Sequence, residues 1–143
     1  MQTADAYCIM DHPPYTAEFE FKASRKVLFP YINTPGGLAQ WFADDVVVNE
    51  DKVFTFFWNG ERARAHRVLQ RANRLVRFEF LDESESLPDT DLPNAVVEIC
   101  LEENDLTGAV FLNVTDSVTA NDEEEFRAIW NQMTDSLREI VGG

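Results

Sequence analysis

The chain has 143 residues, of which 45% are hydrophobic, and it carries a formal net charge of −14 at pH 7. This length is typical of one domain with one core, and the apolar content excludes a disordered chain. The acidic charge argues against a nucleic-acid partner, because phosphate backbones would be repelled. No apolar run approaches the ~20 residues that cross a bilayer and the start of the chain lacks a signal-peptide pattern, so we expect a cytoplasmic protein without a membrane span.

The N-terminal segment, residues 1–14, shows no hydrophobic period and ends in Pro13-Pro14. Proline rings and their missing N–H groups suit an extended lead-in, so we expect a tail here and one domain over residues 15–143. From Tyr15 to Lys22 apolar and polar residues alternate strictly, which predicts a half-buried antiparallel strand.

Two short helices are predicted after this strand. Ser24 can cap the first, and Pro30 should stop or kink it, because proline removes a helical hydrogen bond and clashes with the preceding turn. The second opens at Thr34-Pro35, where a capping hydroxyl precedes a proline suited to the first helical position, and should end near Ala43.

Asn59-Gly60 is the strongest hairpin signal in the chain, because it separates an apolar strand over 53–58 from a second alternating run. A further strand is expected over 46–48. Such a two-residue turn sets the register and places large rings opposite alanines on one face. The expected pairs are Trp58 with Glu61, Phe56 with Ala63, and Phe54 with Ala65.

Further strands are predicted over 75–81, 95–102 and 109–115, separated by the turn-rich or acidic stretches 82–94 and 103–108. The sequence therefore predicts about six or seven strands.

A long amphipathic helix is predicted at the C-terminus. Asn121 with Glu124 three residues later can open it, and Gly142-Gly143 permits its end. Its apolar stripe must be buried against the sheet, so the fold class is α+β. The stripe consists of Phe126, Trp130, Met133, Leu137 and Ile140 or Val141.

A set of residues after the first strand and on the last helix carries a family resemblance. They are Ala23-Ser24 through Val27, Tyr31-Ile32, Thr34-Pro35, Leu38, Trp41-Phe42 and Ala43-Asp44-Asp45, with Trp130 and Leu137 on the last helix. In these residues the chain resembles the START-like superfamily, which includes birch-pollen allergens and proteins resembling the activator of a heat-shock chaperone ATPase. The resemblance implies a helix-grip fold, in which a curved antiparallel sheet wraps around the long C-terminal helix. It also implies a pocket between them for lipids, sterols or other apolar molecules, although some relatives bind proteins and a few catalyse cyclisations.

No catalytic, metal or cofactor site is predicted. His12 and His66 sit in no recognisable motif, and no catalytic residue set of the superfamily matches the chain. The paired acids at 44–45, 50–51 and 123–125 lack the spacing of a calcium loop. Cys8 and Cys100 match no metal-ligand or redox spacing and are expected to be free thiols.

Six of the twelve basic residues fall between Arg62 and Arg77. They form either a docking patch for a protein partner or cross-strand partners for the surplus carboxylates, and the second alternative needs no partner.

The aromatic residues and the small residues opposite them suggest a ligand pocket between sheet and helix, although aromatics more often fill a core. The predicted function is non-enzymatic binding of a small apolar or amphipathic, lipid-like ligand. The alternatives are a protein-interaction module and a cyclase-type enzyme. The candidate ligand-binding residues are Trp41, Phe54, Phe56, Trp58, Ala63, Ala65, Arg67, Phe78, Phe111, Trp130 and Met133.

Overall fold

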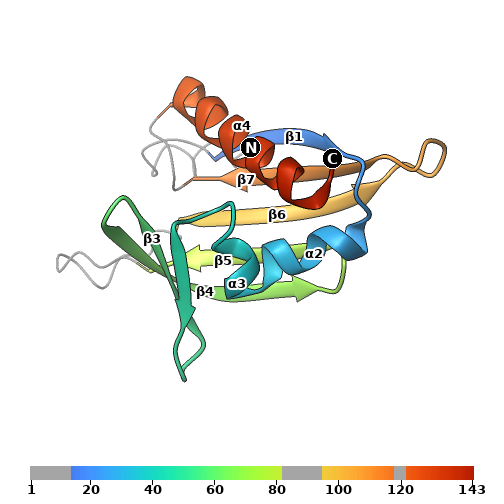
Figure 1. Ribbon diagram of the computed structural model, residues 1–143. Coiled ribbons are helices and arrows are strands. Elements are labelled where there is room, and N and C mark those ends of the chain that lie inside the picture. Colours follow the sequence, from blue (N-terminus) through green and yellow to red (C-terminus); the bar gives the residue numbers. More distant parts are fainter. Residues whose placement is uncertain (1–13, 82–94, 118–121) are drawn as a thin grey trace, which may run out of the picture.

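A computed structural model of the chain describes residues 14–81, 95–117 and 122–143. Within them seven strands form one curved antiparallel sheet, and the three helices lie on one of its faces (Figure 1). The strand order is β1-β7-β6-β5-β4-β3-β2, so β1 and β2 form the two edges. This arrangement confirms the predicted helix-grip α+β fold. The elements are β1 (Tyr15–Phe21), α2 (Arg25–Asn33), α3 (Pro35–Leu38), β2 (Asp45–Val48), β3 (Val53–Trp58), β4 (Glu61–Arg71), β5 (Leu75–Phe80), β6 (Val96–Glu103), β7 (Val110–Asp116) and α4 (Glu123–Val141).

The core lies between the helices and the inner face of the sheet. Strict alternation along β5 and β7 sends every second side chain inward, where it is buried. Ile99 of β6, for example, pairs with Val76 of β5 on one side and Val114 of β7 on the other, and all three are at most 1% exposed. The predicted N-terminal tail lies outside the described residues apart from Pro14, as do 82–94, Cys8 and His12.

The β3–β4 hairpin confirms the predicted register. Asn59 and Gly60 have φ angles of 51° and 85°, the left-handed values that a two-residue hairpin turn requires. Trp58 therefore pairs with Glu61 and Phe56 with Ala63.

Helix α2 continues through Pro30 to Asn33, so the predicted stop at Pro30 is wrong. Ser24 caps its start as expected, its Oγ accepting from the N–H of Val27 at 3.1 Å. Thr34 supports the far end, because both its backbone N–H and its hydroxyl donate to the carbonyl of Pro30. Together with the burial of Leu28, Phe29 and Ile32, these contacts outweigh the single hydrogen bond that proline removes.

Helix α3 is only one turn long and ends at Leu38, five residues before the predicted end at Ala43. Its close contact with α2 requires a glycine at position 37. A Cβ at Gly37 would lie 2.2 Å from the carbonyl oxygen of Pro30 and 2.7 Å from Cα of Tyr31.

Helix α4 begins one residue later than predicted, at an N-cap Asp122 that accepts from Glu125 N–H at 2.7 Å. Asn121 itself lies outside the described residues. The helix ends at Gly142, whose φ of 85° is the expected left-handed cap. Of the predicted stripe, Phe126, Trp130 and Leu137 are fully buried. No helix in the described ranges has the length and apolar character needed to cross a membrane.

Candidate functional site

A groove of about 780 Å³ opens between α4, the segment that follows α3, and the β3–β4 hairpin. Its volume falls within the ~300–1,000 Å³ of small-molecule sites. Ligand pockets are usually apolar with a few polar groups that orient the ligand, and this groove has both kinds of side chain. The lining residues are 39–44 (Ala39, Gln40, Trp41, Phe42, Ala43 and Asp44), then Trp58, Asn59, Glu61, Arg62 and Ala63, and on α4 Ile129, Gln132, Met133 and Ser136.

The floor of the groove is a cluster of aromatic rings held by backbone hydrogen bonds. The indole N–H of Trp41 donates to the carbonyl of Tyr31 at 2.8 Å, and that of Trp58 donates to the carbonyl of Phe42 at 2.7 Å. Phe42 packs edge-on against Trp58, with 5.4 Å between centroids, and lies 5.7 Å from Trp130. Both indole donors are therefore satisfied, and the rings are held in place as an apolar surface.

The α4 wall is anchored by a buried polar contact. Asp116 is 1% exposed, and its carboxylate accepts from the indole N–H of Trp130 at 2.7 Å. Thr134, also buried, donates its hydroxyl to carbonyl oxygens of the preceding turn. Among the described residues, every buried side-chain donor and acceptor has a hydrogen-bond partner, so the core beneath the groove contains no unsatisfied polar side chain.

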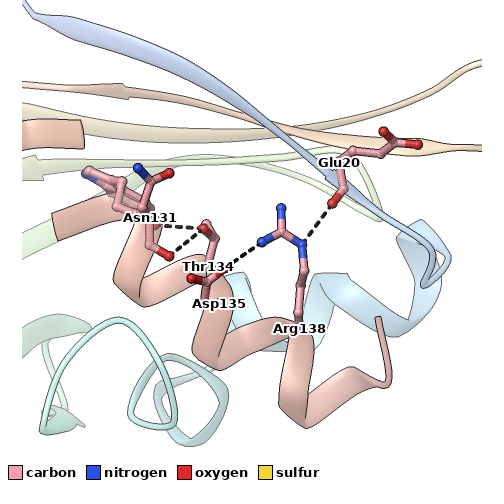
Figure 2. A network of polar contacts seen from close by, with 6 residues as sticks. Glu20, Asn131, Thr134, Asp135 and Arg138 are labelled. Carbon is pink, nitrogen blue, oxygen red and sulfur yellow. Dashed lines mark hydrogen bonds and ion pairs between the residues drawn. The ribbon is translucent and has the colours of Figure 1, made fainter. Parts of the chain in front are cut away.

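A second anchor joins the end of α4 to β1. Arg138 donates from Nε to the backbone carbonyl of Glu20 at 3.1 Å and from Nη1 to Asp135 at 2.9 Å (Figure 2). Its guanidinium also lies over the ring of Phe21, 4.9 Å from the centroid. These contacts hold α4 at the β1 edge, and the groove opens on the side of α4 nearer the β3–β4 hairpin.

The predicted ligand-binding residues divide between the groove and the core. Trp41, Trp58, Ala63 and Met133 line the groove. Ala65 does not line the groove, because it is 0% exposed and lies among packed aromatic rings. The other members of this buried group are Phe54, Phe56, Phe78 and Trp130.

Phe111 lies apart from the other predicted residues. It pairs with Glu20 of β1 and Glu102 of β6, which places it on the outer face of the sheet, away from the helices. Strand alternation explains this, because its neighbours Val110 and Leu112 take the inward positions.

Arg67 points inward but serves as a structural tie. Its Nη1 donates to the backbone carbonyl of Asn33 at 2.7 Å and to the side-chain oxygen of Asn33 at 2.9 Å. The guanidinium also lies 5.2 Å from the centroid of the Phe54 ring. Burial lowers the pKa of Arg67, and its position at the end of α2 complements the helix dipole. Arg67 does not line the groove.

The sequence prediction missed several lining residues. Phe42 was assigned only to the resemblance, and Ile129, Gln132 and Ser136 flank Met133 on α4. The helical period offered a signal, since positions three and four apart share a face. This face of α4 lines a groove because α4 lies beside the β3–β4 hairpin.

The other side chains that could act in catalysis or bind a metal, His66 and Cys100, lie on the outer face of the sheet. His66 is exposed on the outer face opposite Val53, and within the described ranges no three His, Cys, Asp or Glu side chains gather as a metal site. Cys100 is also on that face, where burial, followed by Glu102 and Glu98, raises the pKa of its thiol. This disfavours the reactive thiolate at neutral pH.

Two of the six arginines between Arg62 and Arg77 are engaged within the protein. Arg67 turns inward to Asn33, and Arg77 forms a 3.0 Å ion pair with Glu98 on the adjacent strand. The Arg77–Glu98 ion pair is a cross-strand contact, the kind that we expected if these arginines pair with carboxylates of the sheet.

Comparison with known proteins supports the same architecture. A solved structure from Bacteroides fragilis, BfR322, is 32% identical, covers 90% of this chain and is covered over 93% of its own length, with a TM-score of 0.53. The Aha1 dimer from Colwellia psychrerythraea is 15% identical, with coverages of 90% and 92% and a TM-score of 0.63. DynU16, a protein in the dynemicin biosynthetic locus, is 15% identical and has a TM-score of 0.65. The match covers 89% of this chain and 46% of DynU16. No curated protein matches the chain significantly.

The family assignment follows from sequence and geometry together. The model of the START-like superfamily domain matches residues 9–143, which include all the strands and helices described above. The chain belongs to the START-like superfamily.

Proposed function

We propose that this protein binds a small amphipathic molecule in the groove beside α4 and does not convert it chemically. The observation that carries the proposal is the groove itself, about 780 Å³ between α4 and the hairpin, with an aromatic floor and polar residues at its rim. Such a site can bury an apolar body while a polar end stays at the mouth. Superfamily membership agrees with this function, since START-like domains often bind ligands.

The side chains at the groove favour binding over catalysis. Its described lining contains no His, Cys or Lys, the groups that most often act as bases or nucleophiles. The carboxylates of Asp44 and Glu61 are exposed rather than desolvated, which is unlike the environment of a tuned general acid. A cyclase-type activity would need acid or base groups shielded from water beside the aromatic rings, and these two carboxylates are exposed.

The test compares two alanines on the same strand. Ala63 lines the groove, whereas Ala65 is 0% exposed in the packed core. Ala63→Phe should obstruct the groove and weaken saturable binding of the neutral dye Nile red while changing the free energy of unfolding by less than ~1 kcal/mol. Ala65→Leu should overpack the core and cost about 1–3 kcal/mol, yet the folded protein should still bind the dye.

Binding would be measured by titration calorimetry and stability by urea denaturation. The proposal is wrong if the parent protein shows no saturable binding, or if Ala63→Phe binds as well as the parent does.

A further inference from the structure

The groove ends at a group of side chains around the Asn59-Gly60 turn. Trp58 and Glu61 are direct partners across the two strands, so their side chains emerge on the same face. Asp44 reaches the same turn, since its Oδ2 accepts from the backbone N–H of Asn59 at 2.8 Å. One tryptophan and two carboxylates thus meet at one end of the groove.

The two carboxylates are available to a ligand. Asp44 is held in place, because its own N–H also donates to the carbonyl of Phe57 at 2.8 Å. Across the described ranges, the Oδ1 of Asp44 and both carboxylate oxygens of Glu61 make no hydrogen bond or ion pair. Both residues are exposed and line the groove, so a ligand in the groove can reach their carboxylates.

The indole ring of Trp58 offers a flat surface beside these carboxylates. One side of the ring stacks on Phe56, at 5.6 Å between centroids and 10° between planes. Trp58 is only partly buried and its N–H is already bound to the carbonyl of Phe42, so what it offers a ligand is the part of its ring that stays exposed in the groove. Tryptophan is the aromatic side chain that binds cations best through its ring.

One cation, Arg62, also lines this end of the groove. It pairs with Phe57 across the strands, so it alternates with Glu61 and Ala63 along β4. The two carboxylates of Asp44 and Glu61 outnumber this one guanidinium, in a chain whose net charge is −14.

We propose that the groove selects an amphiphile with a positively charged head, an amine or quaternary ammonium group bound on the Trp58 ring between Asp44 and Glu61. The apolar body extends along Ile129 and Met133. This inference rests on the proposed function and specifies its ligand class. An anionic head, such as the carboxylate of a fatty acid, would be repelled at the same place.

The experiment compares three amphiphiles that share a dodecyl chain, each below its micelle concentration: dodecyltrimethylammonium, dodecyl maltoside and laurate. Calorimetry at low salt should show the ammonium compound binding about tenfold tighter than laurate, with the maltoside between them. The preference should shrink in high salt, because the carboxylates are exposed.

Two double variants distinguish the effect of the carboxylates at the groove from the effect of the protein's net charge. Asp44→Asn with Glu61→Gln should remove most of the preference for the ammonium compound over laurate. Asp105→Asn with Glu139→Gln removes the same number of charges away from the groove and should retain the preference. Asp44→Asn could disturb the Asn59-Gly60 turn, so Glu61→Gln is also tested alone. This single variant should reduce the preference for the ammonium compound over laurate about threefold.

Equal or tighter binding of laurate by the parent protein would overturn the inference while leaving the proposed function standing. A preference that survives in the groove double variant would also overturn it. Absence of binding by all three amphiphiles would instead remove the proposed function.

Discussion

Replacing Gly37 with alanine should destabilise the protein by about 3 kcal/mol, at the upper end of the usual cost of overpacking. The new Cβ would lie 2.2 Å from the carbonyl oxygen of Pro30 and 2.7 Å from Cα of Tyr31. Ordinary contacts begin at 3.4 Å, so α2 and α3 must separate by about 1 Å. Both atoms belong to the backbone of a packed helix and cannot rotate away as a side chain would.

The neighbouring glycine provides a matched control. A Cβ at Gly36 meets nothing within 4 Å, so Gly36→Ala should stabilise the protein by about 0.4–1 kcal/mol by restricting the unfolded chain. Urea denaturation followed by tryptophan fluorescence would measure both variants. Gly37→Ala should also weaken Nile red binding, because the chain after α3 carries Trp41 and Phe42 into the groove. Two variants of equal stability would refute the close-contact argument.

Two further substitutions test the hairpin and the α4 anchor. Gly60→Val should cost about 1–2 kcal/mol in urea denaturation, because a β-branched residue is strained at a φ of 85°, whereas Gly60→Asn should cost less; equal costs would contradict the turn assignment. Asp116→Leu should cost about 1–3 kcal/mol, because it leaves the buried indole N–H of Trp130 without an acceptor, whereas Asp116→Asn keeps an oxygen there and should cost under ~1 kcal/mol. A leucine variant as stable as the asparagine variant would show that this hydrogen bond contributes little.

The fold could be predicted from the sequence because its main signals are local. The Asn59-Gly60 turn sets the pairing of Trp58 with Glu61 through backbone angles that only a few residue types adopt. Alternation along β1 and the apolar stripe of α4 each reflect a period dictated by backbone geometry. These signals determined the strands, the long helix and the layered arrangement.

The candidate site depended on contacts between distant segments. Ala63 and Ala65 have the same local pattern, yet one lines the groove and the other is sealed beneath aromatic rings. The difference arises from where α4 and the segment after α3 cross the sheet, and Asp116 and Arg138 set the position of α4 through partners 14 and 118 residues away.

Tertiary packing also overruled one local expectation and gave Arg67 its partner. Helix α2 passes Pro30 because burial of its apolar face outweighs one lost hydrogen bond, and Arg67 donates to the backbone carbonyl of Asn33 at the end of that helix. The sequence by itself determined which segments become strands and helices, since backbone periodicity is written into short stretches of residues. Only the tertiary structure decided which of their side chains enclose the groove, because that depends on how separate elements pack against one another.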